Sequence, residues 1–333
     1  MTAGQALVVS QPGQVGLQHR DIPVPGPGDL LVTPELIGMC GTDLEIIDGT
    51  IDPAYIHYPL VLGHEWTGIA ASGPLAGTRV VVEGVIPCGH CARCVAGQTN
   101  LCESYDEIGF TRDGVAAPQV VVPAMLAHPL RPEVAADDAV LTEPAAVVYQ
   151  AISRAHTEPG RRVLVIGDGT IALLAVALLR LWSPAEIVLL GRRDGQRDLA
   201  ATAGADRFET DLAAAGNGYD LVFEAAGTTD AAATAIGAAR RGGTIVLVGL
   251  PPHGATVPLA VDDAVNNDLT ILGSFSYTST SWRAIVTLLN SGQIRPGFLI
   301  THRFPLAGWE QAIATLRGAD SPRGKVLLDL TGG

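Results

Sequence analysis

Two kinds of hydrophobic pattern divide the chain near Thr142. Before this point, short apolar runs such as Leu30–Val32 and Arg79–Val82 are separated by turn residues, including the stretch Pro25–Gly28. Short runs bounded by glycine and proline are typical of β-strands joined by tight turns. The first part of the chain therefore predicts an irregular, β-rich domain.

After Thr142, apolar segments of strand length alternate with segments of helix length. We expect strands at 163–166, 186–190, 221–224, 244–248 and 270–272, and helices at 170–182, 197–203 and 231–239. Strands that alternate with helices in this way predict a doubly wound parallel sheet. From Trp282 onward the pattern predicts a helix, a helical segment at 309–317 and a final strand at 325–330.

Length and charge narrow the function classes. The 333 residues, 47% of them hydrophobic, are enough for two domains with cores of their own. The net charge of −13 and the lack of a basic cluster argue against binding to nucleic acid or to an anionic membrane. The stretch Met1–Gln5 lacks a charged segment followed by a long apolar one, so we expect a cytoplasmic protein. The apolar region 163–191 is interrupted too often to span a membrane.

Four of the five cysteines lie close together in the sequence, in the spacing C-x2-C-x2-C-x7-C. They are Cys88, Cys91, Cys94 and Cys102. Such short gaps let four thiolates converge on one tetrahedral Zn²⁺, and a site filled by four cysteines is closed and structural. In a reducing compartment, clustered cysteines are metal ligands more often than disulfides. The fifth cysteine, Cys40, stands apart and requires another explanation.

Cys40 has possible partners in His64, Glu65 and Glu143. A thiolate, an imidazole and carboxylates on separate segments suit a catalytic Zn²⁺, because such a site keeps a position open for water or substrate. A lone cysteine or histidine is more often part of a core than a ligand. The combination of these motifs favours the metal site.

A glycine-rich turn connects the first strand and the first helix of the second part. Its residues are Gly167, Asp168, Gly169, Thr170 and Ile171. Gly167 permits a tight turn and Gly169 permits close approach of a pyrophosphate to the helix N-terminus, so we expect a dinucleotide site. The alternative is an ordinary glycine turn.

The end of the next strand bears on the choice of cofactor. An NAD enzyme usually carries an acidic residue here, but this chain has Gly191, Arg192 and Arg193. Two guanidinium groups without an acid favour NADP over NAD, because they can bind a 2′-phosphate. Alternatively, the two arginines are solvated loop charges, as the neighbouring Asp194 would allow.

Taken together, these motifs resemble those of the zinc-containing medium-chain dehydrogenases of the alcohol, polyol and sugar dehydrogenase group. The resemblance covers nearly the whole chain, with all motifs in the family's order. It implies an α/β protein with a GroES-like β-rich catalytic domain, at residues 1–149 and 287–333, and a Rossmann cofactor-binding domain at residues 150–286. It also implies two zinc ions per chain, one catalytic and one structural.

The resemblance further assigns roles to single residues. Cys40, His64 and, directly or through water, Glu65 and Glu143 match the ligands of the catalytic zinc. Thr42 matches the hydroxyl that takes the substrate proton, and Asp43 matches a residue that orients the site. Where ethanol-type members continue the proton relay with a histidine, this chain has Glu45. Further residues match positions near the nicotinamide cofactor: Val248, Gly249, Ser274, Phe275 and Lys325.

The implied reaction is the reversible oxidation of a secondary alcohol to a ketone, with hydride transfer to the nicotinamide. The motifs favour a polyol, sugar or cyclitol substrate, and an aminocyclitol or threonine-type dehydrogenase remains an alternative. Two alternatives belong to other function classes. One is a non-catalytic protein that binds zinc and a cofactor. The other is a zinc-ribbon protein that binds nucleic acid, although the acidic flank Glu103–Glu107 argues against it. Family members are homodimers or homotetramers, and the segment 269–274 is a possible pairing edge.

Overall fold

The chain forms two compact units in the computed structural model, which describes residues 4–318 and 322–332. Unit 1 comprises residues 1–143, 277–319 and 325–333, and unit 2 comprises residues 144–276 and 320–324. The boundaries expected from the sequence, after residues 149 and 286, lie within helices α4 (Thr142–Arg154) and α10 (Ser279–Asn290). A helix continues its periodicity through such a boundary, so the sequence has no break to mark it. Residues 1–3 of the N-terminal stretch Met1–Gln5 lie outside the described residues.

Unit 2 contains a parallel sheet of the doubly wound kind, as the sequence predicts. Within the described residues its strand order is β11-β10-β9-β12-β13-β14, and all neighbouring pairs are parallel. The order reverses between β9 and β12, which is where this kind of sheet binds ligands. The strands are β9 (Arg162–Ile166), β10 (Glu186–Leu190), β11 (Arg207–Glu209), β12 (Tyr219–Glu224), β13 (Ala239–Leu247) and β14 (Thr270–Gly273).

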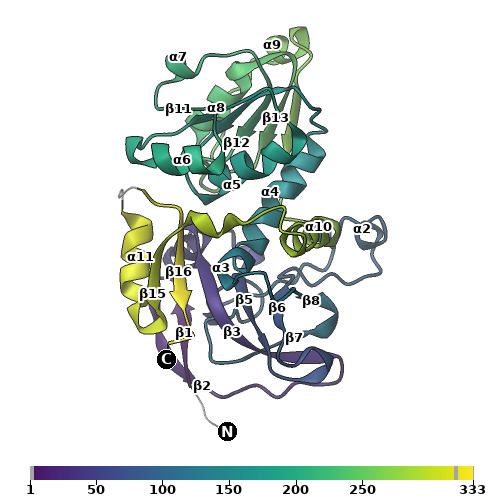
Figure 1. The fold of residues 1–333 in the computed structure, drawn as a ribbon, viewed down its shortest axis with the longest axis vertical. Coiled ribbons are helices and arrows are strands. Elements are labelled where there is room, and N and C mark those ends of the chain that lie inside the picture. Colours follow the sequence, from purple (N-terminus) through teal and green to yellow (C-terminus); the bar gives the residue numbers. More distant parts are fainter. Residues whose placement is uncertain (1–3, 319–321, 333) are drawn as a thin grey trace. The chain divides into compact units, whose positions relative to one another are not determined.

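Helices cover this sheet and bury its apolar strands (Figure 1). Helix α5 packs beside α6 and against β9, whereas α8 packs against β12 and β13. The central strands are apolar over most of their length, as in Val163–Ile166 of β9, because both of their faces are covered. The helices of unit 2 are α4 from Pro144 onward, α5 (Thr170–Leu179), α6 (Arg197–Ala203), α7 (Leu212–Ala215), α8 (Thr229–Ala238) and α9 (Val261–Asn266).

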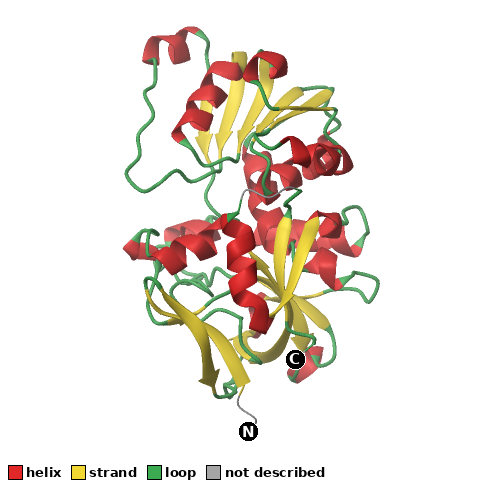
Figure 2. Ribbon diagram, turned by 90° about the vertical axis from the view of Figure 1, so that its left-hand side faces the viewer, coloured by secondary structure: helices red, strands yellow, loops and turns green. Residues whose placement is uncertain are grey.

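Unit 1 is rich in strands joined by long loops, shown in yellow and green in Figure 2. One described sheet has the order β2-β1-β4, and a larger one has the order β15-β16-β3-β5-β6-β8, with β7 paired to β3. The strands are β1 (Gly4–Gln11), β2 (Gln14–Arg20), β3 (Asp29–Met39), β4 (Leu60–Val61), β5 (Glu65–Ala70), β6 (Arg79–Val82), β7 (Val120–Pro123), β8 (Ala127–Pro129), β15 (Ile300–Pro305) and β16 (Lys325–Asp329).

Short helices connect or flank the strands of unit 1. They are α1 (Gly41–Asp48), α2 (Ala92–Val95), α3 (Ala136–Ala139) and α11 (Trp309–Arg317), together with α10. The core of unit 1 contains four consecutive residues of β1, 6–9, together with apolar residues of β3 and Trp66 of β5. The β-rich character predicted for the first part of the chain is confirmed.

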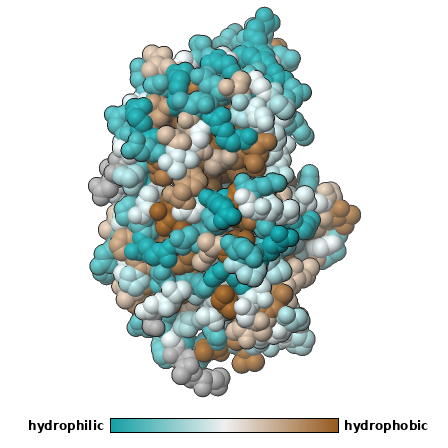
Figure 3. Space-filling model, viewed as in Figure 1, coloured by the Kyte–Doolittle hydropathy of each residue, from teal (hydrophilic) through white to brown (hydrophobic). Residues whose placement is uncertain are grey.

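The surface is mainly polar, with scattered apolar residues on the face shown in Figure 3. None of the helices described here combines the length and the apolar character that crossing a bilayer would require.

Candidate metal and dinucleotide sites

Three potential metal ligands meet where strands β3 and β5 pair. Cys40 directly follows β3, and His64 directly precedes β5, whose first residue is Glu65. Because Gly38 and Glu65 are paired in the antiparallel register, the chain places these side chains close together. Sγ of Cys40 lies 3.3 Å from Nε2 of His64, and one ligand atom from each of the three residues lies within 4.8 Å of the others.

The electrostatics of this cluster favour a bound cation. Burial alone would lower the pKa of His64, but the negative charges of Cys40 and Asp43 raise that pKa well above its usual range. Nδ1 of His64 and Oδ1 of Asp43 lie 3.6 Å apart, and neither has a hydrogen-bond partner within residues 4–318 and 322–332. A sulfur, nitrogen and oxygen donor set that attracts positive charge fits Zn²⁺.

Close backbone packing fixes the position of His64. Gly63 has φ of +102°, in the left-handed region, and its carbonyl oxygen accepts a hydrogen bond from the N–H of Val115 at 3.1 Å. A Cβ atom on Gly114 would lie 2.5 Å from the same carbonyl oxygen. Glycine is therefore required at both positions, and the loop ahead of His64 has little freedom to move.

Helix α1 places Thr42 and Asp43 beside the cluster. Oδ2 of Asp43 accepts a hydrogen bond from the backbone N–H of Cys40 at 2.9 Å, which ties the start of the helix to the thiol. Burial raises the pKa of the Asp43 carboxyl. Thr42 is partly exposed in the first turn of the same helix. The predicted proton acceptor and the predicted orienting residue thus flank Cys40.

Lys325 lies in this cluster, although the sequence analysis assigned it to the cofactor. Its ammonium donates a hydrogen bond to Oε2 of Glu65, and the two side chains are 1% and 3% exposed. A Cβ atom on Gly38 would lie 2.5 Å from that oxygen, so glycine leaves room for the pair. The described contacts of Lys325 are therefore with the metal-ligand cluster of unit 1, and an approach to the cofactor stays a prediction.

Two more carboxylates belong to the same region of unit 1. Burial and the negative charge of Glu65 raise the pKa of Glu143 to about 8. Burial also raises the pKa of Glu107 to about 7, against the opposing effect of His64. Glu143 is not part of the three-residue group of mutually close ligand atoms, so it is at most an additional ligand. Glu107 was not predicted from the sequence, because its acidic neighbours made it resemble part of a solvated flank.

The four clustered cysteines come together around α2. One sulfur atom from each of Cys88, Cys91, Cys94 and Cys102 lies within 4.8 Å of the others. Backbone N–H groups point at the sulfurs: that of Cys94 donates to Cys91 at 3.4 Å, and that of Cys88 donates to Cys102 at 3.3 Å. Hydrogen bonds from the backbone of Glu103 and of Cys94 lower the pKa of Cys91 to about 6. Four sulfurs in this arrangement fit a closed structural Zn²⁺ site.

The glycine-rich turn of unit 2 fits the pyrophosphate of a dinucleotide. Gly167 has φ of +120°, and a Cβ atom there would lie 3.0 Å from the backbone of Ala225. Gly169 caps α5, and a Cβ atom on it would meet no described atom within 4 Å. The first turn of α5, with Thr170 and Ile171, thus begins beside open space, where helix N–H groups can bind a phosphate.

Asp168 of this turn binds the residues that follow β10. Its Oδ2 accepts hydrogen bonds from the backbone N–H groups of Arg192 and Arg193 at 2.8 and 3.0 Å, and its Oδ1 accepts one from the guanidinium of Arg193 at 2.8 Å. A Cβ atom on Gly191 would lie 2.8 Å from the Asp168 side chain. Arg193 is therefore already paired, whereas Arg192 is exposed.

The remaining predicted cofactor residues of unit 2 follow strands β13 and β14. Val248 donates its backbone N–H to Glu224 at 3.0 Å, and a Cβ atom on Gly249 would lie 2.3 Å from the backbone nitrogen of Gly227. Oγ of Ser274 is buried without a hydrogen-bond partner in the described part of the chain, and Phe275 is 37% exposed. An orphaned buried hydroxyl beside the strand ends fits a bound cofactor.

Comparisons with known proteins agree with this geometry. The family description "Alcohol dehydrogenase GroES-like domain" matches residues 26–132, and "Zinc-binding dehydrogenase" matches residues 170–291. An L-galactonate-5-dehydrogenase from Escherichia coli K12 is 30% identical over 92% of this chain and 93% of its own length. The chain belongs to the zinc-dependent medium-chain dehydrogenases.

Solved structures of this family show the same fold. A zinc-binding dehydrogenase from Sinorhizobium meliloti, bound to NADP, has a TM-score of 0.91 and 30% identity, and the match covers 99% of this chain and 100% of that one. An alcohol dehydrogenase from Escherichia coli CFT073, in complex with NADH, has a TM-score of 0.90 and 28% identity, with 98% of each chain covered. The medium-chain dehydrogenase described here is thus an oxidoreductase with a GroES-like and a Rossmann-type domain.

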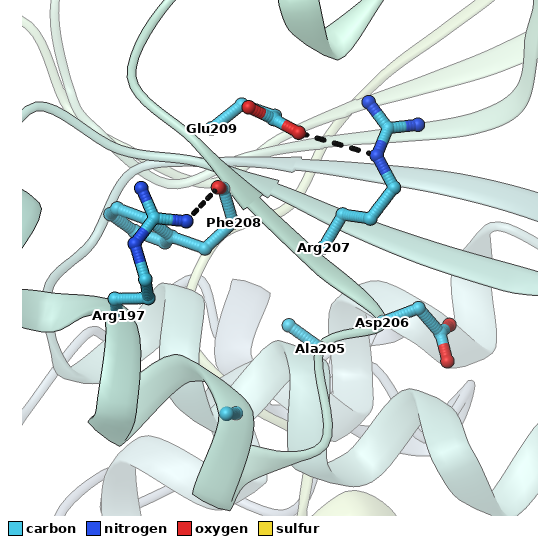
Figure 4. Close-up of a pocket in the computed structure, with 7 residues that line it drawn as sticks. Arg197, Ala205, Asp206, Arg207, Phe208 and Glu209 are labelled. Atoms are coloured by element: carbon cyan, nitrogen blue, oxygen red, sulfur yellow. Dashed lines mark hydrogen bonds and ion pairs between the residues drawn. The ribbon is translucent and has the colours of Figure 1, made fainter.

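A separate pocket of this dehydrogenase lies between α6 and the edge strand β11 (Figure 4). Its volume is 290 Å³, and it contains none of the predicted site residues. Its charged groups already have partners: Arg207 pairs with Glu186 and Glu209 at 3.2 and 3.3 Å, and Asp206 pairs with Arg180 at 2.7 Å. The pocket therefore offers little free charge to a ligand.

Proposed function

We propose that this dehydrogenase reversibly oxidises a secondary alcohol group of a polyol, sugar or cyclitol to a ketone. The observation that carries the proposal is the convergence of Cys40, His64 and Glu65 within 4.8 Å of one another. The Escherichia coli relative is named for a sugar acid, L-galactonate, which supports a polyhydroxylated substrate. A threonine-type or aminocyclitol substrate is the alternative. The panel of substrates described below distinguishes it from a polyol, sugar or cyclitol.

Each residue of the cluster would have a separate role in the reaction. Cys40 and His64, together with Glu65 and Glu143, would hold a Zn²⁺ whose Lewis acidity lowers the pKa of an alcohol and polarises a carbonyl. Thr42 would accept the proton from the substrate hydroxyl. Asp43 orients the start of α1 through its bond to the N–H of Cys40, as described above. Glu45 is partly exposed and lies one turn after Thr42 on that helix.

The glycine-rich turn and Arg192 would hold the nicotinamide cofactor, which accepts the hydride when bound. Arg192 is exposed, and the end of β10 carries Gly191 in place of the usual acidic residue, which favours NADP over NAD. The pairing of Arg193 with Asp168 weakens the contribution of this second arginine. The preference for NADP therefore rests mainly on Arg192.

We further expect two zinc ions per chain, a cytoplasmic location and a homodimer or homotetramer. We keep the division into a catalytic part and a cofactor part that the sequence predicts, at 1–149 with 287–333 and at 150–286. The two structural units have slightly different bounds, as given above. Strand β14 lies at the edge of its sheet, where a second copy of the chain can add a strand.

The test combines metal analysis with a substrate panel. Purified protein should contain about two zinc ions per chain, and Cys40→Ser should lose one of them together with all activity. Polyols, sugars, cyclitols, threonine and simple alcohols are offered with NADP or NAD, and nicotinamide absorbance is followed. Retention of both zinc ions by Cys40→Ser would reject the catalytic site. A zinc-loaded protein that is inactive on the entire panel would indicate a non-catalytic role.

A further inference from the structure

Glu107 is a buried carboxylate, and its second oxygen has no hydrogen-bond partner in the described part of the chain. It lies in a loop that pairs with the segment after β6: Val85 and Glu107 form an antiparallel bridge, and Ile108 donates to the carbonyl of Gly84 at 3.0 Å. The residue is 7% exposed. Its Oε2 accepts a hydrogen bond from the hydroxyl of Tyr105. For Oε1 there is no hydrogen bond from any residue in 4–318 or 322–332.

Tyr277 brings a hydroxyl group to the same place. Its oxygen accepts a hydrogen bond from the N–H of Gly84 at 2.8 Å, and the residue is 1% exposed. The hydroxyl proton has no acceptor within the described residues. A Cβ atom on Gly84 would lie 3.1 Å from the Tyr277 oxygen and 3.6 Å from Oε1 of Glu107. The hydroxyl of Tyr277, which can donate, and Oε1 of Glu107, which can accept, therefore both lie close to the same point beside Gly84.

This pair adjoins the metal-ligand cluster of unit 1. Phe110, on the same loop as Glu107, packs on the ring of His64 with 5.0 Å between the ring centres. A Cβ atom on Gly109 would lie 3.0 Å from Cβ of His64, so the loop is in close contact with this ligand. Burial, together with the charges of Glu107 and Glu143, raises the pKa of Tyr277 well above its usual range. The phenol therefore keeps its proton and remains a donor.

We propose that Glu107 and Tyr277 bind a second hydroxyl group of the substrate, on a carbon next to the one that is oxidised. This hydroxyl donates a hydrogen bond to Oε1 of Glu107 and accepts a hydrogen bond from the phenol of Tyr277. The inference rests on the proposed function and narrows its substrate class to vicinal diols.

The chemistry of the two groups discriminates between substituents. A hydroxyl group is both a donor and an acceptor, so it satisfies Glu107 and Tyr277 together. An ammonium group donates to the carboxylate but has no lone pair for the phenol, which leaves a buried donor unpaired. A hydrogen atom satisfies neither. The pair therefore selects a diol over an amino alcohol and over a simple alcohol.

The experiment uses the zinc-loaded holoenzyme and three probes: cyclohexanol, 1,2-cyclohexanediol and 2-aminocyclohexanol. We expect the wild type to show the highest kcat/KM with the diol. In assays at a pH above the Glu107 pKa of about 7, the ratio of kcat/KM for the diol to that for cyclohexanol should fall about 30-fold in Glu107→Gln, as for loss of a hydrogen bond to a charged group. In Tyr277→Phe the same ratio should fall about 5-fold. The exposed neighbour Glu103 supplies the control, because Glu103→Gln should keep the wild-type ratio.

The ratio separates binding from folding, because a general loss of structure or zinc lowers the rates for both probes alike. An unchanged ratio in Glu107→Gln, or equal kcat/KM for cyclohexanol and the diol in the wild type, would overturn this inference and leave the proposed function intact. A wild type that prefers the amino alcohol would also overturn it. No turnover of the probes or of the wider substrate panel would reject the proposed function itself.

Discussion

The ammonium of Lys325 donates a hydrogen bond to the carboxylate of Glu65, and both side chains are almost completely buried. Burial alone would lower the pKa of Lys325, but the negative charges of Glu65 and Cys40 raise it, so the lysine is charged. Strand β16 carries Lys325 into the sheet beside β3, and the pair thereby joins the end of the chain to the metal-ligand cluster. A buried charge left without its partner is strongly unfavourable.

Lys325→Met should therefore destabilise the metal-free protein by about 3–5 kcal/mol, because it leaves the Glu65 carboxylate buried and unpaired. Urea unfolding, followed by tryptophan fluorescence in the presence of a chelator, measures the loss. The double variant Lys325→Met/Glu65→Gln is the control, and it should recover most of the stability because it carries neither charge. A loss below about 1 kcal/mol in the single variant would contradict the prediction.

The sequence predicted which side chains come together at the candidate metal site better than it predicted their surroundings. Cys40, His64 and Glu65 are residue types that bind zinc, and their neighbouring motifs identify them without knowledge of the fold. Lys325 meets Glu65 only because β16 pairs with β3, and no local pattern contains that long-range pairing. Glu107 was missed for the same reason, since its burial depends on a bridge to Val85 and on Tyr277 from a distant segment.

The fold of unit 2 was easier to predict than the position of the unit boundaries. Strands such as β9 and β10 are continuous apolar runs, so their length and type are visible in the sequence. The boundary lies inside α4, where Glu143 belongs to unit 1 and Pro144 to unit 2. A change of packing partner within one helix changes neither its periodicity nor its composition.

Asp168 should influence the choice between NADP and NAD. Although burial raises its pKa, the hydrogen bonds and charge of Arg193 lower it overall, so the carboxylate is ionised and holds that arginine. Asp168→Asn would release the guanidinium and shift the ratio of kcat/KM for NADP to that for NAD upward by about 5-fold, as for a partly buried ion pair.

Steady-state kinetics with both cofactors measure this shift. Asp194→Asn is the matched control, because Asp194 is exposed and pairs with Arg197 rather than with Arg193. A fall in the ratio, or an equal shift in the control, would count against a role for the Asp168–Arg193 pair in cofactor selection.

Asp220 should make the stability of unit 2 depend on pH. Burial would raise its pKa, but the N–H of Arg162 at 2.8 Å and the guanidinium of Arg240 at 2.6 Å lower it below the usual value. A carboxyl group with a lowered pKa in the folded state stabilises the protein above its unfolded-state pKa, and this stabilisation disappears as the pH falls through the folded-state pKa.

The free energy of unfolding should thus be about 1–2 kcal/mol lower in Asp220→Asn than in the wild type at pH 7. The difference should shrink as the pH falls through the lowered folded-state pKa of Asp220, where the carboxyl group becomes uncharged. Urea unfolding at a series of pH values tests this, with the exposed Asp198→Asn as the control. A difference that is constant with pH would show that the carboxylate charge is not responsible.

The cysteine cluster should support the start of α10 through the contact between Thr99 and Ser279. Thr99 lies in the turn that leads to Cys102, and its Oγ1 accepts a hydrogen bond from the backbone N–H of Ser279 at 2.9 Å. Ser279 is the first residue of α10 and follows Tyr277 by two positions. Loss of the metal from the cluster should loosen this turn and so weaken the attachment of α10.

Hydrogen exchange measured by mass spectrometry tests this connection. In Cys94→Ser the peptide that contains Ser279 should exchange about 5- to 10-fold faster than in the wild type, as for loss of one hydrogen bond in local opening. Thr99→Val should produce the same increase while zinc stays bound, whereas Thr99→Ser keeps the hydroxyl and should exchange at the wild-type rate. If Cys94→Ser loses its zinc and the Ser279 peptide keeps its protection, the cluster stabilises its own loop alone and contributes nothing to the position of α10.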